Sequence, residues 1–219
     1  MNAWVLSTVI GTAVCGIAGA TTVKVEVVGS VDFNGIRTGE FGGIPSGAPA
    51  SMSFLVDSNN FTNGTFFPTR GYAIDPASFV LNIGAESASM LQPYPSGETP
   101  YFVIRDNDPA VDGFLLASDP DAGWPNGVWT DSPARFDPTF HALFHATYGG
   151  DKLASLDIMQ ALGTYTFDGL TVFNWGLDDA GNQPLGLIFD SFTISAIPAP
   201  GLAVMLGILP LAATRRRGR

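Results

Sequence analysis

Cysteine is almost absent: the 219-residue chain contains one, Cys15. A single thiol cannot form an intramolecular disulfide, so the core alone must hold the fold together. A lipid-attachment motif at Cys15 would need a leucine three residues earlier and a small residue just before it, whereas Thr12 and Val14 stand there. We therefore expect neither a disulfide framework nor a lipid anchor at this position.

Positive charge is also scarce, and it is unevenly placed. The chain has 10 Lys and Arg against 20 Asp and Glu, and four of the basic residues, Arg215, Arg216, Arg217 and Arg219, lie in the last five positions. The preceding residues therefore carry six basic against 20 acidic side chains, a net charge of −14. Nucleic-acid binding needs clustered Lys and Arg to contact phosphates, so this class of partner is excluded.

Recognisable catalytic motifs are missing. The chain has no nucleophile elbow, P-loop or dinucleotide-binding glycine motif. His141 and His145 have the spacing of a helical zinc pair, but Ala142 replaces the glutamate of the zinc-protease motif. On a strand the two histidines would lie on one face about 13 Å apart, too far for one metal ion. Asp178 and Asp179 are adjacent and would point to opposite faces of a strand, so we predict that the protein is not an enzyme.

Long helices are not expected, because the chain has 26 Gly, 16 Pro and only 14% charged residues. Leucines and a methionine recur at helical spacing only in 151–162. Alternating or β-branched runs between turn residues predict strands. They span 22–28, 51–56, 78–83, 101–105, 113–117, 140–148, 164–167, 171–175 and 187–195. Nine short strands in 21–196 predict an antiparallel β-sandwich of the jelly-roll or lectin-like type. The run 187–195 is so apolar that we expect a central strand buried on most of its length.

The N-terminal residues 1–20 have the pattern of a signal peptide. Residues 4–17 are uncharged and largely apolar, and Ala18 and Ala20 supply the small side chains that signal peptidase accepts. We therefore expect a signal helix here, export by the secretion machinery, and cleavage before Thr21. A buried first helix is less favoured, because a β-branched strand follows at once.

The C-terminal residues 197–219 combine a short Pro-containing motif, an apolar segment and a basic end. No charged residue occurs in 191–214. As a helix, the dense apolar part 201–213 would be about 20 Å long. That is short of the roughly 30 Å hydrocarbon core, and Pro210 weakens the helix further. The segment is predicted as an apolar transmembrane helix of marginal length, which halts translocation with its arginines on the cytoplasmic side.

This tail resembles the sorting signal of PEP-CTERM proteins. The resemblance rests on Pro198, Ala199 and Pro200, then on the apolar segment, then on Arg215, Arg216 and Arg217; Ala199 stands where the family usually has Glu. It implies processing by an exosortase in a Gram-negative-type bacterium that makes exopolysaccharide, and location in the cell envelope, at the cell surface or in the extracellular matrix. The body is similar in style to many PEP-CTERM ectodomains, which implies no binding site.

Five aspartates form the densest cluster of oxygen ligands: Asp106, Asp108, Asp112, Asp119 and Asp121. Calcium prefers such hard ligands from adjacent loops, so a structural calcium ion is one prediction for this region. The other is that these residues only form turns, as Asp and Asn often do. No other cofactor is expected.

Trp124 and Trp129 flank a Pro-Asn-Gly turn and are the main candidates for stacking on sugar rings. Trp175, Tyr94 and Tyr101 could join them, as in lectin-like sandwiches. The alternative is that these rings pack in the core, where indoles are mostly buried. Coplanar rings on an open face would favour sugar binding, and burial of all three tryptophans would oppose it.

Three functions remain as hypotheses. The first is an exported structural protein of the cell surface or matrix, sorted by its tail. The second is a carbohydrate-binding module that acts on exopolysaccharide through Trp124, Trp129 and Trp175. The third is a secreted hydrolase, which a cleft gathering two carboxylates and a histidine would favour.

The two ends predict a mature chain that is shorter at both sides. In a producing strain with an active exosortase, we expect its intact mass to correspond to a start at Thr21 and to a C-terminus that lacks Arg219. A chain that still begins at Met1 would contradict the signal peptide. A stably membrane-bound chain that keeps Arg219 would contradict the sorting signal.

Overall fold

The described part of the chain is built almost entirely of β-strands. The computed structural model describes residues 20–65, 68–107, 111–119 and 126–198. Within them lie twelve strands and one short 3₁₀ helix, η1 (Pro76–Ser78). The strands are β1 (Thr22–Asn34), β2 (Pro49–Asn63), β3 (Thr69–Ile74), β4 (Val80–Ile83), β5 (Glu86–Ser89), β6 (Tyr101–Arg105), β7 (Val111–Ala117), β8 (Val128–Trp129), β9 (His141–Gly149), β10 (Gly163–Tyr165), β11 (Leu170–Asp179) and β12 (Asn182–Ile197).

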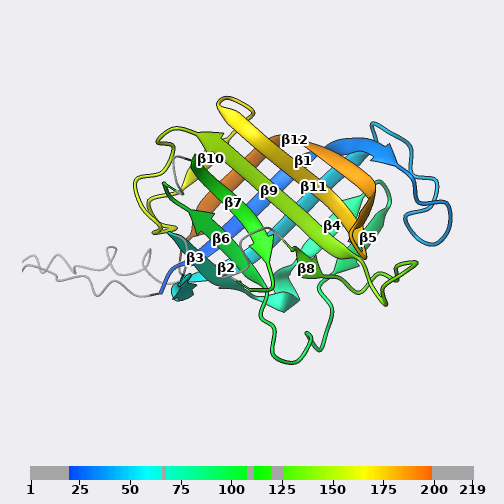
Figure 1. The fold of residues 1–219 in the computed structure, drawn as a ribbon, viewed down its shortest axis with the longest axis horizontal. Helices are drawn as coiled ribbons and strands as arrows, with labels where there is room; N and C mark the ends of the chain where they lie inside the picture. The colour runs from blue at the N-terminus through cyan, green and yellow to red at the C-terminus, as the bar shows by residue number, and fades with distance from the viewer. Residues whose placement is uncertain (1–19, 66–67, 108–110, 120–125, 199–219) are drawn as a thin grey trace, which may run out of the picture.

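Eight of these strands close into an antiparallel barrel (Figure 1). Around the ring run β1, β2, β3, β6, β7, β9, β11 and β12, each paired with the next, and β12 pairs back with β1. The short strands β4, β5, β8 and β10 attach to this ring. Neighbours in the ring follow one another along the chain, so this is an up-and-down barrel with insertions.

The predicted β-sandwich is therefore wrong, although the all-β class is right. The finding that overturns it is the pairing of β1, which bonds to β2 on one edge and to β12 on the other. A sandwich would leave free edges in two sheets, whereas here the sheet meets itself. Alternating residues fix one buried face for each strand, but they do not say whether that face packs on a second sheet or encloses its own interior.

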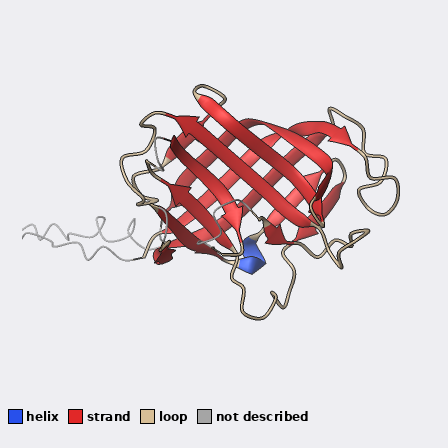
Figure 2. Ribbon diagram, viewed as in Figure 1, coloured by secondary structure: helices blue, strands red, loops and turns tan. Residues whose placement is uncertain are grey.

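The predicted flanking helices are not among the elements of the described residues. In the described residues η1 is the only helix, and no helix there is long and apolar enough to cross a membrane (Figure 2). The transmembrane helix was predicted in 201–213, and the signal helix in 1–20. Apart from Ala20, both segments lie outside the described residues. The segment 151–162 forms turns and loops, and it buries Leu153, Ile158 and Ala161 against the barrel.

Each of the nine predicted strand ranges overlaps an observed strand, but the interpretation of 187–195 needs correction. Within 187–195 the buried side chains are Leu187 and Phe189, then Phe192 and Ile194, while Ile188 is 42% exposed. The phase changes because β1 residues Val28 and Gly29 pair with Ser191 and Phe189, which leaves Asp190 as an extra, bulged residue. The run is apolar because two alternating patterns are joined by a bulge, and not because both faces are buried.

Aromatic side chains fill the barrel interior. The ring of Phe192 lies 4.9 Å from Phe114, 5.1 Å from Phe144, 5.3 Å from Tyr165 and 6.1 Å from Phe102, measured between centroids. These rings come from β12, β7, β9, β10 and β6, so one cluster ties together opposite parts of the wall. An eight-stranded barrel is just wide enough for its side chains to fill it. A ligand site must therefore lie at the ends of the barrel or on its outer surface.

Between β2 and β9, the barrel wall separates into two branches of strands. One edge of β2 pairs with β1, while the other edge pairs with β3 toward one end of the barrel and with β4 toward the other. Likewise, one edge of β9 pairs first with β8 and then with β7. A bridge between Met90 and Thr130 connects β5 to the chain just after β8. Two branches, β3–β6–β7 and β4–β5–β8, therefore separate and leave a gap in the outer surface.

The start of β1 and the end of β12 lie side by side. Thr22 at the start of β1 pairs with Ile197 at the end of β12, and these two strand ends lie at the left in Figure 1. At the opposite end, Ala180 and Gly181 form the turn between β11 and β12, with φ of 50° and 83°. Such two-residue turns need positive φ at both positions. We call this opposite end, to which β4, β5 and β8 also belong, the distal end.

We expect Phe192→Ala to lower the free energy of unfolding by about 3–5 kcal/mol, because it empties the centre of the aromatic cluster. Phe136→Ala is the matched control: Phe136 is 60% exposed, and its loss should cost less than about 0.5 kcal/mol. Urea denaturation followed by tryptophan fluorescence measures both. Equal effects of the two variants would show that the cluster is not the centre of the core.

Candidate functional site

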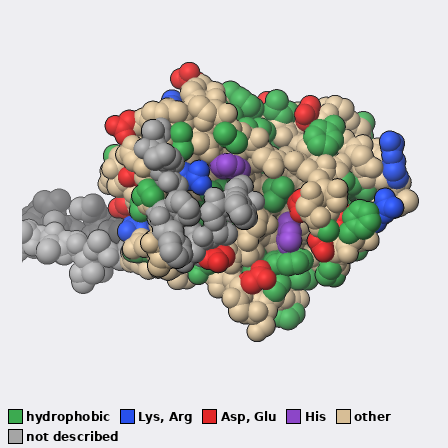
Figure 3. Space-filling model, in the orientation of Figure 1, with side chains coloured by type: hydrophobic (Ala, Val, Ile, Leu, Met, Phe, Trp, Pro, Cys, Tyr) green, Lys and Arg blue, Asp and Glu red, His purple; other side chains and the backbone are tan. Residues whose placement is uncertain are grey.

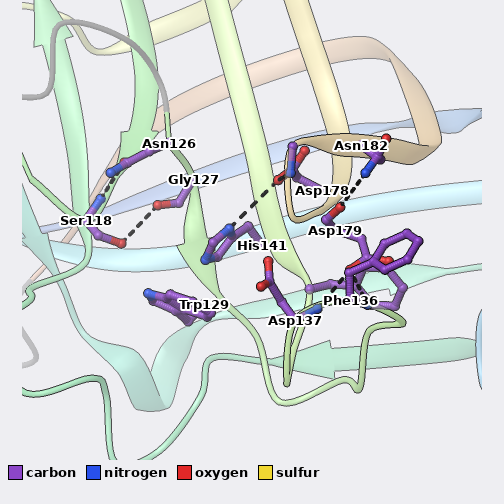
Figure 4. Close-up of polar contacts among 12 residues, drawn as sticks. Ser118, Asn126, Gly127, Trp129, Phe136, Asp137, His141, Asp178, Asp179 and Asn182 are labelled. Atoms are coloured by element: carbon purple, nitrogen blue, oxygen red, sulfur yellow. Dashed lines mark hydrogen bonds and ion pairs between the residues drawn. The ribbon is translucent and has the colours of Figure 1, made fainter.

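A polar cleft with one tryptophan opens where the two branches of the wall separate. It has a volume of about 300 Å³ and lies on the outer surface near the distal end. Figure 4 shows its main side chains, and both histidines of the chain reach the face drawn in Figure 3. We call it the Trp129 cleft, and it is lined by Glu98, Ser118, Asp119, Asn126, Trp129 and His141.

One wall of the cleft is fixed by bonds between the end of β7 and the start of β8. The backbone N–H of Ser118 donates to Oδ1 of Asn126 at 2.9 Å, and the Ser118 hydroxyl donates to the carbonyl of Gly127 at 3.1 Å (Figure 4). Gly127 has φ of 75°, and a Cβ there would lie 2.7 Å from the carbonyl oxygen of Ala142. Only glycine fits this close approach of β8 to β9.

Two further residues hold Trp129 in place. The Tyr94 hydroxyl lies 2.7 Å from the Ser118 hydroxyl and accepts from the backbone N–H of Trp129 at 3.3 Å. Burial raises the pKa of Tyr94, so its hydroxyl stays protonated. The indole Nε1 of Trp129 donates to Glu98 at 2.8 Å. The indole is therefore oriented in the absence of a ligand, and it is only partly buried.

His141 completes the opposite wall. Its imidazole lies against the indole of Trp129, with ring centroids 3.9 Å apart and the planes at 72°. Its Nδ1 is 4.0 Å from an Asp178 carboxylate oxygen. Burial lowers the pKa of His141, and the carboxylates of Asp178, Asp137 and Glu98 oppose that shift only in part. The ring is therefore neutral at neutral pH, with one nitrogen that donates and one that accepts.

Asp179 fixes the loop below His141. It is 4% exposed, and its carboxylate accepts the backbone N–H groups of Arg135, Phe136 and Asp137 at 2.9–3.2 Å. Asp178, its neighbour, is partly exposed on the outer face. The two carboxylates point to opposite faces of β11, as the sequence predicted. His141 and His145 also lie on the outer face of a strand, as expected.

The three predicted sugar-stacking tryptophans are not brought together. Trp129 lines the cleft, but Trp175 is 1% exposed inside the barrel, where it packs opposite Phe144. Trp175 therefore cannot stack on an external ligand. Trp124 lies outside the described residues. Tyr94 contributes its hydroxyl rather than its ring face, and Tyr101 packs against Val103, Leu115 and Ala117 and does not line the cleft.

The predicted calcium ligands are separated by β7. Asp112 lies near its start and Asp119 beyond its end, seven residues apart, or about 23 Å along a strand. Asp112 is fully buried and accepts the backbone N–H groups of Asn107 and Leu153 at 2.9 and 2.7 Å. Asp108 and Asp121 lie outside the described residues. Among the residues that are described, no three acidic or histidine side chains are arranged to hold a metal ion.

Near Asp112, the pKa of Asp106 is raised, first by desolvation and then by the charges of Asp112 and Asp151. These carboxylates therefore repel one another at one end of the barrel. The calcium ion stays a prediction, but Asp112 and Asp119 cannot share it.

The sequence analysis missed most of the residues that build the cleft. Glu98, Ser118 and Asn126 carry no motif, and they meet only because the wall divides. His141 was considered as half of a zinc pair, and its place next to Trp129 depends on the pairing of β8 with β9. The sequence held one local sign of the cleft: a polar residue, His141, at an outward-facing strand position opposite Trp129, which follows a turn.

Comparison with protein-family models, with curated proteins and with solved structures finds no match to this chain. The class that can be defined is structural: a filled, up-and-down eight-stranded barrel with a polar cleft in its outer wall. The cleft and the chain ends are therefore the features that bear on function.

We expect the pKa of His141 in the folded protein to lie below 6.5, and Asp178→Asn to lower it further by removing a charge that favours the imidazolium. Since the unfolded chain then binds the proton more readily, stability should fall as the pH drops below about 6.5. NMR titration measures the pKa, with Asp57→Asn as the control. The signal of His145, whose pKa burial lowers to about 4, titrates separately. A pKa of His141 at or above 6.5 would contradict the burial of its ring.

Proposed function

We propose that the protein is an exported surface protein that binds a saccharide in the Trp129 cleft. The observation that carries this proposal is a partly exposed indole surrounded by polar side chains on a rigid wall. Its Nε1 donates to Glu98, and the backbone N–H of Trp129 donates to Tyr94. Sugar rings present apolar C–H faces that pack on aromatic rings, and hydroxyls that need donors and acceptors at their edges. Both requirements meet at Trp129.

The polar groups of the cleft suit hydroxyl recognition. Neutral His141 and the Asn126 amide can each donate and accept, while Glu98 and Asp119 accept only. The volume of about 300 Å³ lies at the lower end of the range for small-molecule sites. The cleft is thus suited to a short stretch of a saccharide chain rather than to an enclosed ligand.

The chain ends support location at the surface. A sorting signal in 197–219 would follow directly on β12, which ends at the end of the barrel where β1 begins. The Trp129 cleft lies near the opposite, distal end. A protein retained through its C-terminal side would therefore present this cleft outward, toward an exopolysaccharide layer. We propose processing by an exosortase-type enzyme on this basis and on the resemblance of the tail.

A secreted hydrolase is the second candidate, because the cleft gathers two carboxylates, Glu98 and Asp119, with His141. Glycoside hydrolysis uses a carboxyl pair on either side of the scissile bond. Glu98, however, already accepts the indole N–H of Trp129, which gives it a positioning role. We therefore favour binding without turnover. Chromatography of the saccharide after incubation distinguishes the two, since shorter products would support the hydrolase.

We expect Trp129→Ala to weaken saccharide binding at least tenfold, or about 1.4 kcal/mol, because it removes the stacking surface. The control is Phe61→Ala, which removes an aromatic ring that is 42% exposed elsewhere on the barrel. Calorimetric titration with oligosaccharide fragments of exopolysaccharide measures both. No binding by the wild type, or unchanged binding by Trp129→Ala, would refute the proposed function.

A further inference from the structure

A second pocket opens at the distal end, and it is larger than the Trp129 cleft. Its volume is about 780 Å³, and it lies between the loop after β1 and the loop before β9. Ile36 and Arg37 belong to the first loop, and Pro133, Arg135 and Phe136 to the second. We call it the arginine pocket.

Both loops are fixed before any ligand binds. The Asn34 side chain accepts the backbone N–H of Ile36 and donates to the carbonyls of Phe41 and Ile44, at 2.8–3.1 Å. Gly35 N–H donates to the carbonyl of Pro184 at 2.6 Å, which joins this loop to β12. The second loop is held by the three bonds to Asp179. The pocket is thus part of the rigid barrel end.

Two of the six basic side chains in the described residues, Arg37 and Arg135, line this one pocket. Neither forms an ion pair with another described residue, in contrast to Lys24, which pairs with Glu26, and Lys152, which pairs with Asp168. The guanidinium of Arg135 lies 4.7 Å from the ring of Phe136. In an otherwise acidic protein, two uncompensated arginines at one pocket mark a place for an anion.

The carboxylates near the pocket offset the charge of these two arginines only in part. Asp179 lines the pocket, but its oxygens already accept three backbone N–H groups and are shielded from solvent. Asp137 lies toward His141 (Figure 4), and Glu40 accepts from the Ser132 hydroxyl at 3.4 Å. More distant charges are screened beyond about 8 Å at physiological ionic strength. The three charged residues that line the pocket, Arg37, Arg135 and Asp179, carry a net charge of +1.

We propose that the arginine pocket binds the carboxylate of an acidic sugar residue. A guanidinium donates two parallel hydrogen bonds to a carboxylate, and the apolar walls formed by Ile36, Pro133 and Phe136 suit the ring that bears it. The pocket and the Trp129 cleft border the same segment, 129–141, so one saccharide chain can contact both. This inference rests on the proposed function and narrows its ligand to a uronate-containing polysaccharide.

The test uses an oligogalacturonate and the same oligomer after reduction of its carboxyls. We expect the wild type to bind the acidic form at least tenfold more tightly. Arg37→Ala combined with Arg135→Ala should abolish this preference, and binding of the acidic form should weaken as salt rises. Arg70→Ala is the matched control, since Arg70 contacts Asn63 and the ring of Phe61 instead. Calorimetry and thermal unfolding of each variant separate lost binding from lost folding.

Each outcome decides one of the two proposals. Equal binding of acidic and reduced oligomers, still dependent on Trp129, would overturn the acidic specificity and leave the proposed function standing. Acidic binding that needs both arginines but not Trp129 would support the pocket and refute the role of the cleft. Equal binding of a polyglutamate peptide would show recognition of charge alone and overturn the sugar class.

Discussion

Closure of the barrel by β1 is the constraint on which the rest of the structure depends. β1 bonds to β2 over 22–30 and to β12 along nearly its whole length, so the first and last strands complete the same wall. An open sheet of these strands would expose two edges and leave its apolar face uncovered. Closure pairs both edges and encloses the apolar face without a disulfide. It also sets the position of the chain ends, because Thr22 and Ile197 must lie side by side.

Closure of an eight-stranded ring also decides where a ligand can bind. The interior is taken up by rings such as Phe114, Phe144 and Phe192, so it offers stability rather than a site. What remains is the outer surface, which is regular except where the wall divides between β2 and β9. The Trp129 cleft occupies that division. The arginine pocket lies where two long loops meet at the distal end, and both sites therefore arise from insertions into a simple meander.

Much of the strand pattern could be predicted from the sequence, because each strand keeps one apolar face. Three strands were missed: β3 contains Gly71, β5 is short and mostly polar, and β8 has only two residues, too few to show a pattern. The sandwich was wrong because local alternation is the same in a sheet that packs on another and in one that closes. The bulge at Asp190 was hidden for a similar reason, since a phase change resembles a run buried on both faces. The cleft could not be predicted, because Glu98, Ser118 and His141 meet only through that topology.

The buried aspartates show that the fold can give a structural role to carboxylates, although their chemistry alone would suggest a ligand-binding role. Asp112 and Asp179 each lie at an end of the barrel, on β7 and β11, and each is almost fully buried. Burial of a carboxylate is costly unless its oxygens are hydrogen-bonded. Here backbone N–H groups of loops satisfy them: those of Asn107 and Leu153 at one end, and those of residues 135–137 at the other. Each carboxylate thereby ties a loop to the barrel, and Asp179 holds the loop that lines the arginine pocket. The buried aspartates of the barrel are thus structural, whereas Glu98 and Asp119 line the Trp129 cleft.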